Sequence, residues 1–426
     1  MMQPVTESPN GKGILVIGGG IAGMTAAIEA AETGCDVVLV EKAPYLGGRV
    51  SRINQYFPKL CPPTCGLEIN FKRIKNNARI TVLSQAEVAE VTGTPGDYRV
   101  TVKVSPRFVT DACTLCGQCA EVCPAERPDE YNMGLGTTKA AYLPYAMAFP
   151  AAYAIDRAAC KEGCTACAEA CAYGAVDLAQ EPEEKVFEVA SVVAATGWTP
   201  YDANKIDNLG FGRYPNVVTN VIMERLAAPN GPTAGKILRP SDQAQPKSVA
   251  FVQCAGSRDE NHLPYCSAVC CAASLKQATY VKAMDPAAEA VIFYIDIRTP
   301  GRLEDFRTKV VEEQGVELVK GKVAKVEEDP VTHDLLVTAE DVLGGRKVTR
   351  RFHMVVLATG IVPNTDGLPA GFTLDEFRFI AAPEGKTGLY GAGCVRRPEE
   401  VSATVQDATG AALKAYQCVV RSAHHG

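Results

Sequence analysis

The sequence predicts an α/β protein with two nucleotide-binding domains and a cysteine-rich insert in the first of them. Three observations carry this prediction: a strand, glycine turn and helix near the N-terminus, a second buried strand over residues 248–253, and eight cysteines between residues 113 and 171. At 426 residues and 47% hydrophobic content, the chain is long enough for two or three domains with substantial cores.

The first element is a buried strand over residues 13–17 that runs into a glycine turn and then a helical pattern over residues 24–32. Gly18 allows a tight turn, Gly20 lets the backbone approach a pyrophosphate, and Gly23 allows the helix to pack closely on the strand. The N–H groups at the start of the helix are free to bind phosphate oxygens. The pattern therefore predicts a dinucleotide site.

A second strand over residues 36–40 ends in Glu41, followed by Lys42. A carboxylate at this position accepts hydrogen bonds from an adenosine ribose and disfavours a 2′-phosphate. The alternative is a solvated carboxylate at a strand end. We expect Glu41 and Lys42 to belong to the cofactor site.

The cysteines of the insert form two runs with the spacing of a two-cluster bacterial ferredoxin. In this motif the fourth cysteine of each run ligates the other cluster. The first predicted [4Fe-4S] set is Cys113, Cys116, Cys119 and Cys171, and the second is Cys160, Cys164, Cys167 and Cys123. The second run is less regular, since it has one extra residue before Cys164, with Gly163 to absorb unusual dihedral angles. For that run a zinc site stays open.

Composition excludes several classes of function. The net charge is −6 without a Lys- or Arg-rich run, which argues against nucleic-acid binding. We recognise no signal peptide, and the 17 cysteines have metal-ligand spacings rather than those of a disulfide scaffold, so we expect a cytoplasmic protein. The most apolar stretch, residues 140–155, contains two prolines and is shorter than the ~20 residues of a membrane span.

Further motifs resemble the two-dinucleotide-binding-domain flavoproteins of the thioredoxin reductase-like class over nearly the whole chain. They are Gly47-Gly48-Arg49, the two Ala-Thr-Gly turns at Thr196-Gly197 and Thr359-Gly360, and the late segment 388–393. The resemblance implies FAD, with Gly48, Arg49, Thr196, Gly197, Gly360, Gly393 and Cys394 at its site. The class usually has an aspartate where this chain has Cys394, so backbone contacts would have to suffice there.

The predicted domain boundaries follow from these motifs. They are an FAD-binding domain over 12–104, a ferredoxin-like two-cluster insert over 105–180, a continuation of the FAD domain over 181–245, a region similar to an NAD domain over 246–360, and the last part of the FAD domain over 361–426.

The second nucleotide domain lacks the glycine fingerprint. After the strand at 248–253 stand four cysteines within 18 residues: Cys254, Cys266, Cys270 and Cys271. We expect them to bind a third [4Fe-4S] cluster in place of a nicotinamide cofactor, the alternative being buried structural thiols. His262 could tune this cluster or be an ordinary loop histidine.

With cysteines in place of the glycine turn, the chain also resembles the A-type subunit of heterodisulfide reductase. Within that family, the segments at residues 56–66, 214–220 and 298–302 are most similar to the A-type subunit of the quinone-interacting membrane-bound oxidoreductase complex. That likeness implies peripheral membrane association through partners: a second flavin and iron-sulfur subunit, a haem-containing membrane subunit, and adenylylsulfate reductase. The implied function is electron transfer between the quinone pool and adenylylsulfate reductase in dissimilatory sulfur metabolism.

Three alternatives stay open. One is a flavin-based electron-bifurcating subunit of the heterodisulfide reductase type, another is a self-sufficient NAD(P)H-dependent disulfide reductase that uses Cys61 and Cys65, and the third is a zinc-holding scaffold. Cys61 and Cys65 could also be a cluster ligand pair or structural thiols, whereas Cys35 and Cys418 are expected to be structural. We find no catalytic acid–base or nucleophile constellation.

Overall fold

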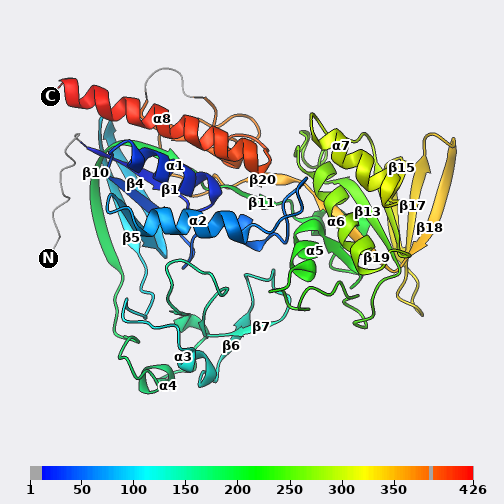
Figure 1. Cartoon of the computed structure of the whole chain (residues 1–426), viewed down its shortest axis with the longest axis horizontal. Coiled ribbons are helices and arrows are strands. Elements are labelled where there is room, and N and C mark those ends of the chain that lie inside the picture. Colours follow the sequence, from blue (N-terminus) through cyan, green and yellow to red (C-terminus); the bar gives the residue numbers. More distant parts are fainter. Residues whose placement is uncertain (1–11, 383–386, 426) are drawn as a thin grey trace. The chain divides into compact units, whose positions relative to one another are not determined.

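The computed structural model describes residues 12–382 and 387–425, with side chains described up to residue 422. By contacts the chain divides into two compact units (Figure 1). The first combines the residues up to Ser51, Thr64–Trp198 and the residues from Pro363 on, and the second combines Arg52–Pro63 and Thr199–Val362. The second unit thus begins before residue 246 and includes a short segment from the N-terminal quarter of the chain.

The first unit is organised around a seven-stranded sheet of order β3-β2-β1-β10-β5-β4, in which β21 also pairs with β10. Its strands are β1 (Gly13–Ile17), β2 (Val37–Glu41), β3 (Ile80–Ser84), β4 (Ala86–Thr94), β5 (Asp97–Val104), β10 (Glu183–Ala194) and β21 (Leu389–Gly391). The 12-residue β10 joins two kinds of sheet, since its first half pairs antiparallel with β5 and its second half pairs parallel with β1 and β21.

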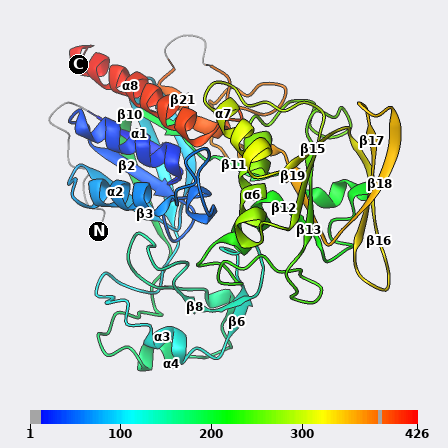
Figure 2. The same ribbon diagram turned by 45° about the vertical axis from the view of Figure 1, so that its right-hand side comes forward.

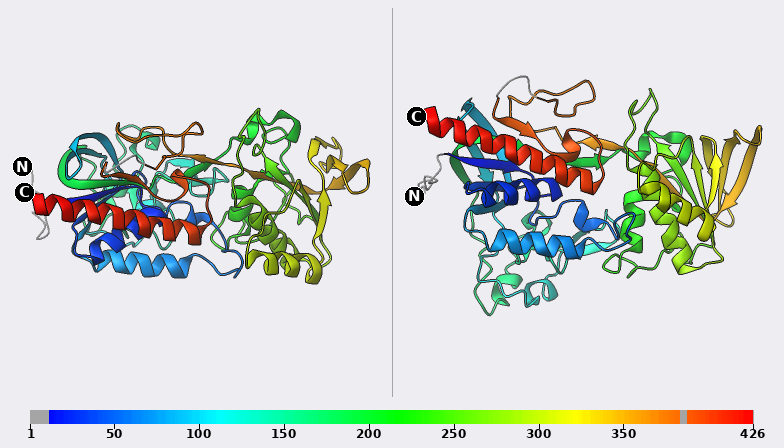
Figure 3. Two further views of the ribbon diagram at one scale, coloured as in Figure 1. Left: turned by 90° about the horizontal axis from the view of Figure 1, so that it is seen from above. Right: turned by 45° about the horizontal axis from the view of Figure 1, so that its top comes forward.

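Helices of the first unit cover this sheet. They are α1 (Ile21–Glu32), α2 (Thr64–Lys75) and α8 (Val401–His425), with the 3-10 turns η1 (Val50–Arg52) and η6 (Gly393–Val395). The long α8 lies along α1 (Figure 3). Small residues make this close approach possible, because α1 buries Ala22, Ala26 and Ala30.

The cysteine-rich insert contains only short elements. They are α3 (Gln118–Glu121), β6 (Glu126–Pro128), β7 (Thr137–Lys139), β8 (Ala141–Tyr142), β9 (Ala154–Ile155), η2 (Arg157–Ala159) and α4 (Ala166–Glu169). Arg107 fixes the insert to the rest of the unit, since its guanidinium donates to the carbonyl oxygens of Pro44 (2.8 Å) and Tyr153 (2.8 Å). Tyr45 packs edge-on against Tyr131 and Tyr145, which strengthens the same junction.

The second unit contains a parallel five-stranded sheet of order β12-β19-β13-β14-β15 and a three-stranded antiparallel sheet of order β16-β17-β18 (Figure 2). The strands are β12 (Val217–Thr219), β13 (Ser248–Ala255), β14 (Glu289–Tyr294), β15 (Glu317–Lys320), β16 (Val323–Glu328), β17 (Leu335–Asp341), β18 (Arg346–Phe352) and β19 (Met354–Thr359). Its helices are η3 (Ala203–Lys205), η4 (Asp207–Leu209), α5 (Asn220–Ala227), α6 (Cys270–Met284), α7 (Leu303–Thr308) and the π-helix η5 (Lys309–Glu313). The short strands β11 (Trp198–Pro200) and β20 (Ile361–Pro363) lie where the chain passes between units.

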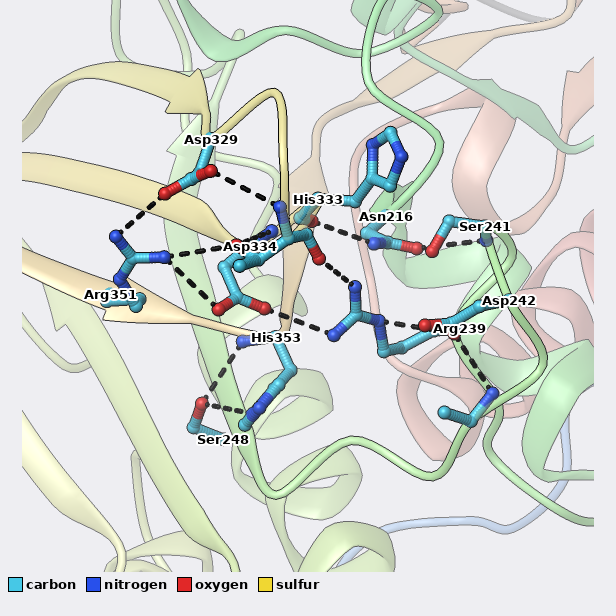
Figure 4. Close-up of polar contacts among 12 residues, drawn as sticks. Asn216, Arg239, Ser241, Asp242, Ser248, Asp329, His333, Asp334, Arg351 and His353 are labelled. Atoms are coloured by element: carbon cyan, nitrogen blue, oxygen red, sulfur yellow. Dashed lines mark hydrogen bonds and ion pairs between the residues drawn. The ribbon is translucent and has the colours of Figure 1, made fainter.

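One apolar core serves both sheets of the second unit, and Phe293 of β14 meets Phe352 of β18 edge-on. A polar network closes one side of it (Figure 4). The buried Arg239 pairs with Asp334 (3.1 Å), and Arg351 pairs with Asp329 (2.9 Å) and Asp334 (3.3 Å). These contacts hold the β16–β17 turn, so we assign the network a structural role.

None of the helices in the described part of the chain has both the length and the apolar character needed to cross a membrane.

Candidate redox-cofactor sites

Three glycines of the turn after β1 and the start of α1 are each explained by their surroundings. Gly18 has φ +103°, and a Cβ there would lie 2.5 Å from the carbonyl oxygen of Ala195. A Cβ on Gly23 would lie 1.7 Å from the carbonyl oxygen of Gly18. A Cβ on Gly20, in contrast, would meet no heavy atom of the described residues within 4 Å. Gly18 and Gly23 are therefore required by packing, and Gly20 borders open space at the N-terminus of α1, where a pyrophosphate fits.

Glu41 ends β2 beside this turn. Its Oε2 accepts a hydrogen bond from the N–H of Gly19 (2.6 Å) and its Oε1 accepts one from the N–H of Ala43 (2.7 Å). The backbone therefore fixes the carboxylate next to the turn, where ribose hydroxyls could donate to it. Lys42 differs, because its ammonium is largely exposed and pairs with Glu87 (2.7 Å).

Gly48 and Arg49 lie next to the same turn. A Cβ on Gly48, whose φ is +51°, would stand 3.0 Å from the Cα of Gly20. Arg49 donates to the carbonyl oxygen of Trp198 (2.6 Å), and its guanidinium lies over the Trp198 ring, 4.6 Å from the centroid. These two contacts with Trp198 fix the orientation of the Arg49 side chain.

Thr196 and Gly197 follow the end of β10. The Thr196 hydroxyl donates to the carbonyl oxygen of Asn364 (2.6 Å), and the Asn364 amide donates back to the carbonyl oxygen of Thr196 (3.0 Å). Gly197 has φ +70°, and a Cβ there would find no described heavy atom within 4 Å. Gly197 therefore resembles Gly20 in bordering open space.

Gly360 was also expected at the FAD site, and its immediate neighbours lie in the second unit. It follows β19 in the second unit, and a Cβ there would lie 2.3 Å from the Ser257 hydroxyl oxygen and 2.9 Å from that of Ser267. The two hydroxyls are hydrogen-bonded to each other (2.8 Å). The small size of Gly360 therefore serves the cysteine loop of the second unit.

Gly393 and Cys394 form the start of η6, against α8. The Gly393 N–H donates to Asp407 Oδ2 (2.7 Å), and Asp407 also pairs with Arg396. Cys394 is buried, its thiol donates to the carbonyl oxygen of Glu399 (3.4 Å), and burial raises the pKa of that thiol. Sequence reasoning missed Asp407, because it lies on α8, 14 positions after Gly393, and belongs to no linear motif.

The insert brings the first cysteine set together. Cys113, Cys116, Cys119 and Cys171 line one small cavity, together with Tyr153 and Tyr173. Cys171 is separated from the other three by more than 50 positions in the sequence, so the crossover arrangement places it there. Burial, followed by the charge of Cys113, raises the pKa of Cys119 to about 11.

The second set of the insert is also close in space. Burial is the main cause that raises the pKa of the Cys160 thiol. Arg157 lowers this pKa, and the charges of Cys123 and Cys164 raise it. Burial likewise raises the pKa of Cys167, with Cys160 and Cys164 as charged neighbours. Gly163 has φ +66°, the backbone conformation anticipated for the extra residue of this run.

The four cysteines of the second unit gather at the end of β13 and the start of α6. Cys254 lies at an irregularity of β13 with φ +55°, and Cys270 and Cys271 occupy the first turn of α6. Burial raises the pKa of Cys254 to about 11, with Arg258 lowering it and the charges of Cys271 and Cys266 raising it. All four thiols therefore lie within electrostatic reach, at the carboxyl edge of a parallel sheet, where ligands bind in such folds.

The loop that carries Cys266 is firmly held. The N–H of Arg258 donates to the carbonyl oxygen of Tyr265 (3.0 Å), and the Tyr265 hydroxyl donates to the carbonyl oxygen of Ile361 (2.8 Å). Arg258 also pairs with Asp296. The His262 Nδ1 lies 2.9 Å from the Tyr201 hydroxyl, a contact that positions this loop histidine.

The remaining cysteines lie outside these three sets. Cys35 is buried, and the Cys418 thiol donates to the carbonyl oxygen of Ala190 (3.2 Å). Cys61 and Cys65 are exposed, Cys61 in a loop and Cys65 in the first turn of α2.

The donor sets fit the predicted groups. Open space beside Gly20 and Gly197, with a fixed carboxylate nearby, suits a dinucleotide. All-cysteine sets of four suit [4Fe-4S] clusters, whose thiolates bind four separate irons. Over residues 12–382 and 387–425, no three His, Cys, Asp or Glu side chains are arranged around a position for a single metal ion.

Comparisons with known proteins agree with this description. Residues 13–104 match the family described as FAD dependent oxidoreductase, and residues 106–126 match the 4Fe-4S binding domain. The chain is 39% identical over 416 residues to the A-type subunit of the "H(2):CoB-CoM heterodisulfide,ferredoxin reductase" of Methanothermobacter marburgensis, covering 94% of this chain and 63% of that protein. It is also 39% identical over 419 residues to the A-type iron-sulfur subunit of the "CoB--CoM heterodisulfide reductase" of Methanocaldococcus jannaschii, again covering 94% and 63%. The chain thus spans just under two thirds of the length of these relatives.

Solved structures show the fold. Thioredoxin reductase of T. acidophilum aligns with a TM-score of 0.53 at 15% identity, covering 95% of this chain and 98% of that one. Thioredoxin reductase of Lactococcus lactis aligns with a TM-score of 0.52 at 13% identity, covering 96% and 99%. The predicted α/β fold of the thioredoxin reductase-like class is confirmed. The chain therefore carries a segment similar to FAD dependent oxidoreductases and a 4Fe-4S binding segment, and over 94% of its length it is similar to the A-type subunit of heterodisulfide reductase.

Proposed function

We propose that this chain is an electron-transfer subunit that holds one FAD and three [4Fe-4S] clusters and uses no nicotinamide. The observation that carries the proposal is the β13–α6 connection, where Cys254, Cys266, Cys270 and Cys271 occupy the place of a phosphate-binding glycine turn. FAD supplies exchange between two-electron and one-electron chemistry, and the clusters supply one-electron steps.

The residues of the chain bind and tune these groups. Gly18, Gly20 and Gly23 shape the pyrophosphate turn, and Glu41 accepts hydrogen bonds from the ribose. The eight cysteines of the insert hold two clusters in the crossover pairing given above, and the four cysteines of the second unit hold the third cluster. Burial of Cys119, Cys167, Cys270 and Cys271 excludes water from one side of each cluster, which affects its potential.

For the partners, we propose the quinone-interacting membrane-bound oxidoreductase type. In this assignment the chain acts from the cytoplasm and reaches the membrane through two partners, a second flavin and iron-sulfur subunit plus a haem-containing membrane subunit, with adenylylsulfate reductase as its exchange partner. The phrases at residues 56–66, 214–220 and 298–302 support it.

A second candidate is a flavin-bifurcating subunit of the heterodisulfide reductase type. The relatives favour it, since both are named for a CoB–CoM heterodisulfide and one of them is also named for ferredoxin. Adding adenylylsulfate reductase together with adenylylsulfate, which accepts the electrons, to the reduced chain distinguishes the two. Reoxidation of the clusters supports the first assignment, and reoxidation only by a heterodisulfide and its own reductase subunits supports the second.

The test of the core proposal is anaerobic purification with counts of iron, sulfide and flavin. We expect about twelve irons and one FAD per chain, and no bleaching of the flavin by NADH. About four irons or fewer would refute the three-cluster assignment. Rapid bleaching by NADH would favour the self-sufficient disulfide reductase instead, and colourless protein with zinc would favour the scaffold.

A further inference from the structure

The first cysteine set of the insert lies beside exposed apolar side chains. Leu115 is 38% exposed, Val122 is 40% exposed and Tyr173 is 58% exposed. Tyr173 lines the same cavity as Cys113, Cys116, Cys119 and Cys171, and Leu115 lies between Thr114 and Cys116, which line it too. Val122 follows α3, and its N–H bonds Gln118 of the cavity wall (3.2 Å). We call Leu115, Val122 and Tyr173 the insert patch.

The residues of the insert patch flank two short helices, since Leu115 and Val122 lie on either side of α3 in the chain and Tyr173 follows α4. Helices α3 and α4 lie side by side in both views (Figure 1, Figure 2). Cys116 is itself exposed, so one edge of the cavity reaches the surface. Leu115 adopts φ +61°, which is unfavourable for a branched side chain, and yet it presents that side chain to water.

The charge closest to the insert patch is negative. Residues 109–122 and 171–180, which include most of the cavity lining, carry three carboxylates, Asp111, Glu121 and Asp177, and no Lys, Arg or His. Glu126, just beyond, is paired with Lys139 (3.0 Å). Asp111 and Glu121 are exposed. The segment between, residues 157–170, is balanced, with Arg157 and Lys161 against Glu162 and Glu169. The acidic surface is therefore on the side of the first cysteine set.

We infer that the insert patch is the docking surface for a one-electron carrier protein with a basic face, and that the Cys113/Cys116/Cys119/Cys171 cluster is the one that exchanges electrons with it. This inference rests on the proposed cluster-binding function. An apolar centre with a tyrosine, with negative charge closest to it, suits a transient complex in which charge steers the encounter and apolar contact seats the partner. In each transfer the reduced cluster loses one electron and the carrier gains it.

Cytochrome c, a basic haem protein, is the probe. The cluster-loaded protein is reduced with dithionite, freed of excess reductant and mixed with ferric cytochrome c, and haem reduction is followed by stopped flow. We expect the second-order rate to fall about tenfold or more from low to high salt. Tyr173→Lys should lower the low-salt rate about tenfold, and Leu115→Lys should act in the same direction. Calorimetric titration of the oxidised protein with cytochrome c should show weaker binding for both variants.

Leu413→Lys is the matched control, because Leu413 is a similarly exposed apolar residue (56%) on α8 of the same unit. It should leave the rate and the binding unchanged. Iron content and visible spectra verify that each variant keeps its clusters, and a small neutral oxidant should react equally with all of them. Equal rates and binding for Tyr173→Lys and wild type, or equal losses in Leu413→Lys, would overturn the docking surface. Iron-free wild-type protein would instead overturn the proposed function itself.

Discussion

The two strand-to-helix connections of this chain, β1 to α1 and β13 to α6, begin alike and differ in what they enclose. The first uses three residues, Gly18–Gly20, and the second uses fourteen, residues 256–269. In the first, glycine removes side chains so that a phosphate can reach the helix N-terminus. In the second, a longer loop brings Cys266 back to the helix start, where it joins Cys254, Cys270 and Cys271.

The comparison indicates how one topological position can be adapted to different cofactors, a pyrophosphate in the first connection and the proposed cluster in the second. Both connections lie at the carboxyl edge of a parallel sheet, where backbone N–H groups and the helix dipole favour an anion. A pyrophosphate is such an anion, and so is a cluster held by four thiolates. The fold supplies the electrostatic setting, and the residues of the turn decide whether a phosphate or, as proposed, a cluster occupies it.

The largest expected effect is that of removing a thiol from the second connection. Cys270→Ser should lower the iron content by about four per chain, while one FAD stays bound. Iron and flavin analysis and the electron paramagnetic resonance spectrum of the reduced protein measure this. Cys418→Ser is the control, since that thiol donates to a carbonyl oxygen in the first unit. Retention of all the iron in Cys270→Ser would remove the proposed difference between the connections.

The next prediction separates the glycines of the first connection. Gly23→Ala places a Cβ 1.7 Å from a backbone oxygen, so we expect about 3 kcal/mol of lost stability and loss of FAD. Gly20→Ala meets open space, so the FAD-free protein should keep its melting temperature while FAD affinity falls about tenfold. Melting curves and flavin titration check both. If Gly20→Ala bound FAD normally, the phosphate would not approach at this turn.

Much of this contrast could be predicted from the sequence. Strand β1 has its predicted bounds, and α1 begins at Ile21 rather than Met24. Local hydrophobic patterns and glycine spacing determine these features. The position of Cys171 beside the first cysteine run also agrees with the motif, because the motif itself encodes that long-range relation.

Other features depend on contacts that no local pattern records. Residues 52–63 pack with the second unit because the N–H of Asn54 donates to Glu224 (2.9 Å) and the carbonyl oxygen of Gln55 accepts from Lys276 (2.7 Å). These partners are 170 and 221 positions apart. Gly360 was expected at the FAD site from its Ala-Thr-Gly motif, yet its close neighbours are Ser257 and Ser267, which lie about a hundred positions earlier.

The helices behind the two connections differ as well, which gives a third prediction. Helix α6 buries Lys276 (4% exposed side chain), whose ammonium pairs with the buried Glu224 (2.9 Å). Lys276→Met should cost about 3–5 kcal/mol, because it leaves the Glu224 carboxylate buried without its counter-charge. Chemical denaturation measures the loss. Lys276→Met with Glu224→Gln should recover part of it, and a double variant no more stable than the single one would contradict this account.

The smallest expected effect tests where Gly360 belongs. A Cβ at this position would lie 2.3 Å from the Ser257 hydroxyl, so Gly360→Ala should shift the loop that carries Cys266 and make the third cluster more labile. FAD content should stay at one per chain, because the crowded atoms lie in the cysteine loop. Iron loss during incubation with a chelator, followed beside flavin absorbance, measures this. Gly197→Ala is the counterpart at the first Ala-Thr-Gly turn, and there flavin binding should weaken while the iron stays. If Gly360→Ala released FAD and kept its iron, Gly360 would serve the flavin, and the two connections would share more of their function than their residues indicate.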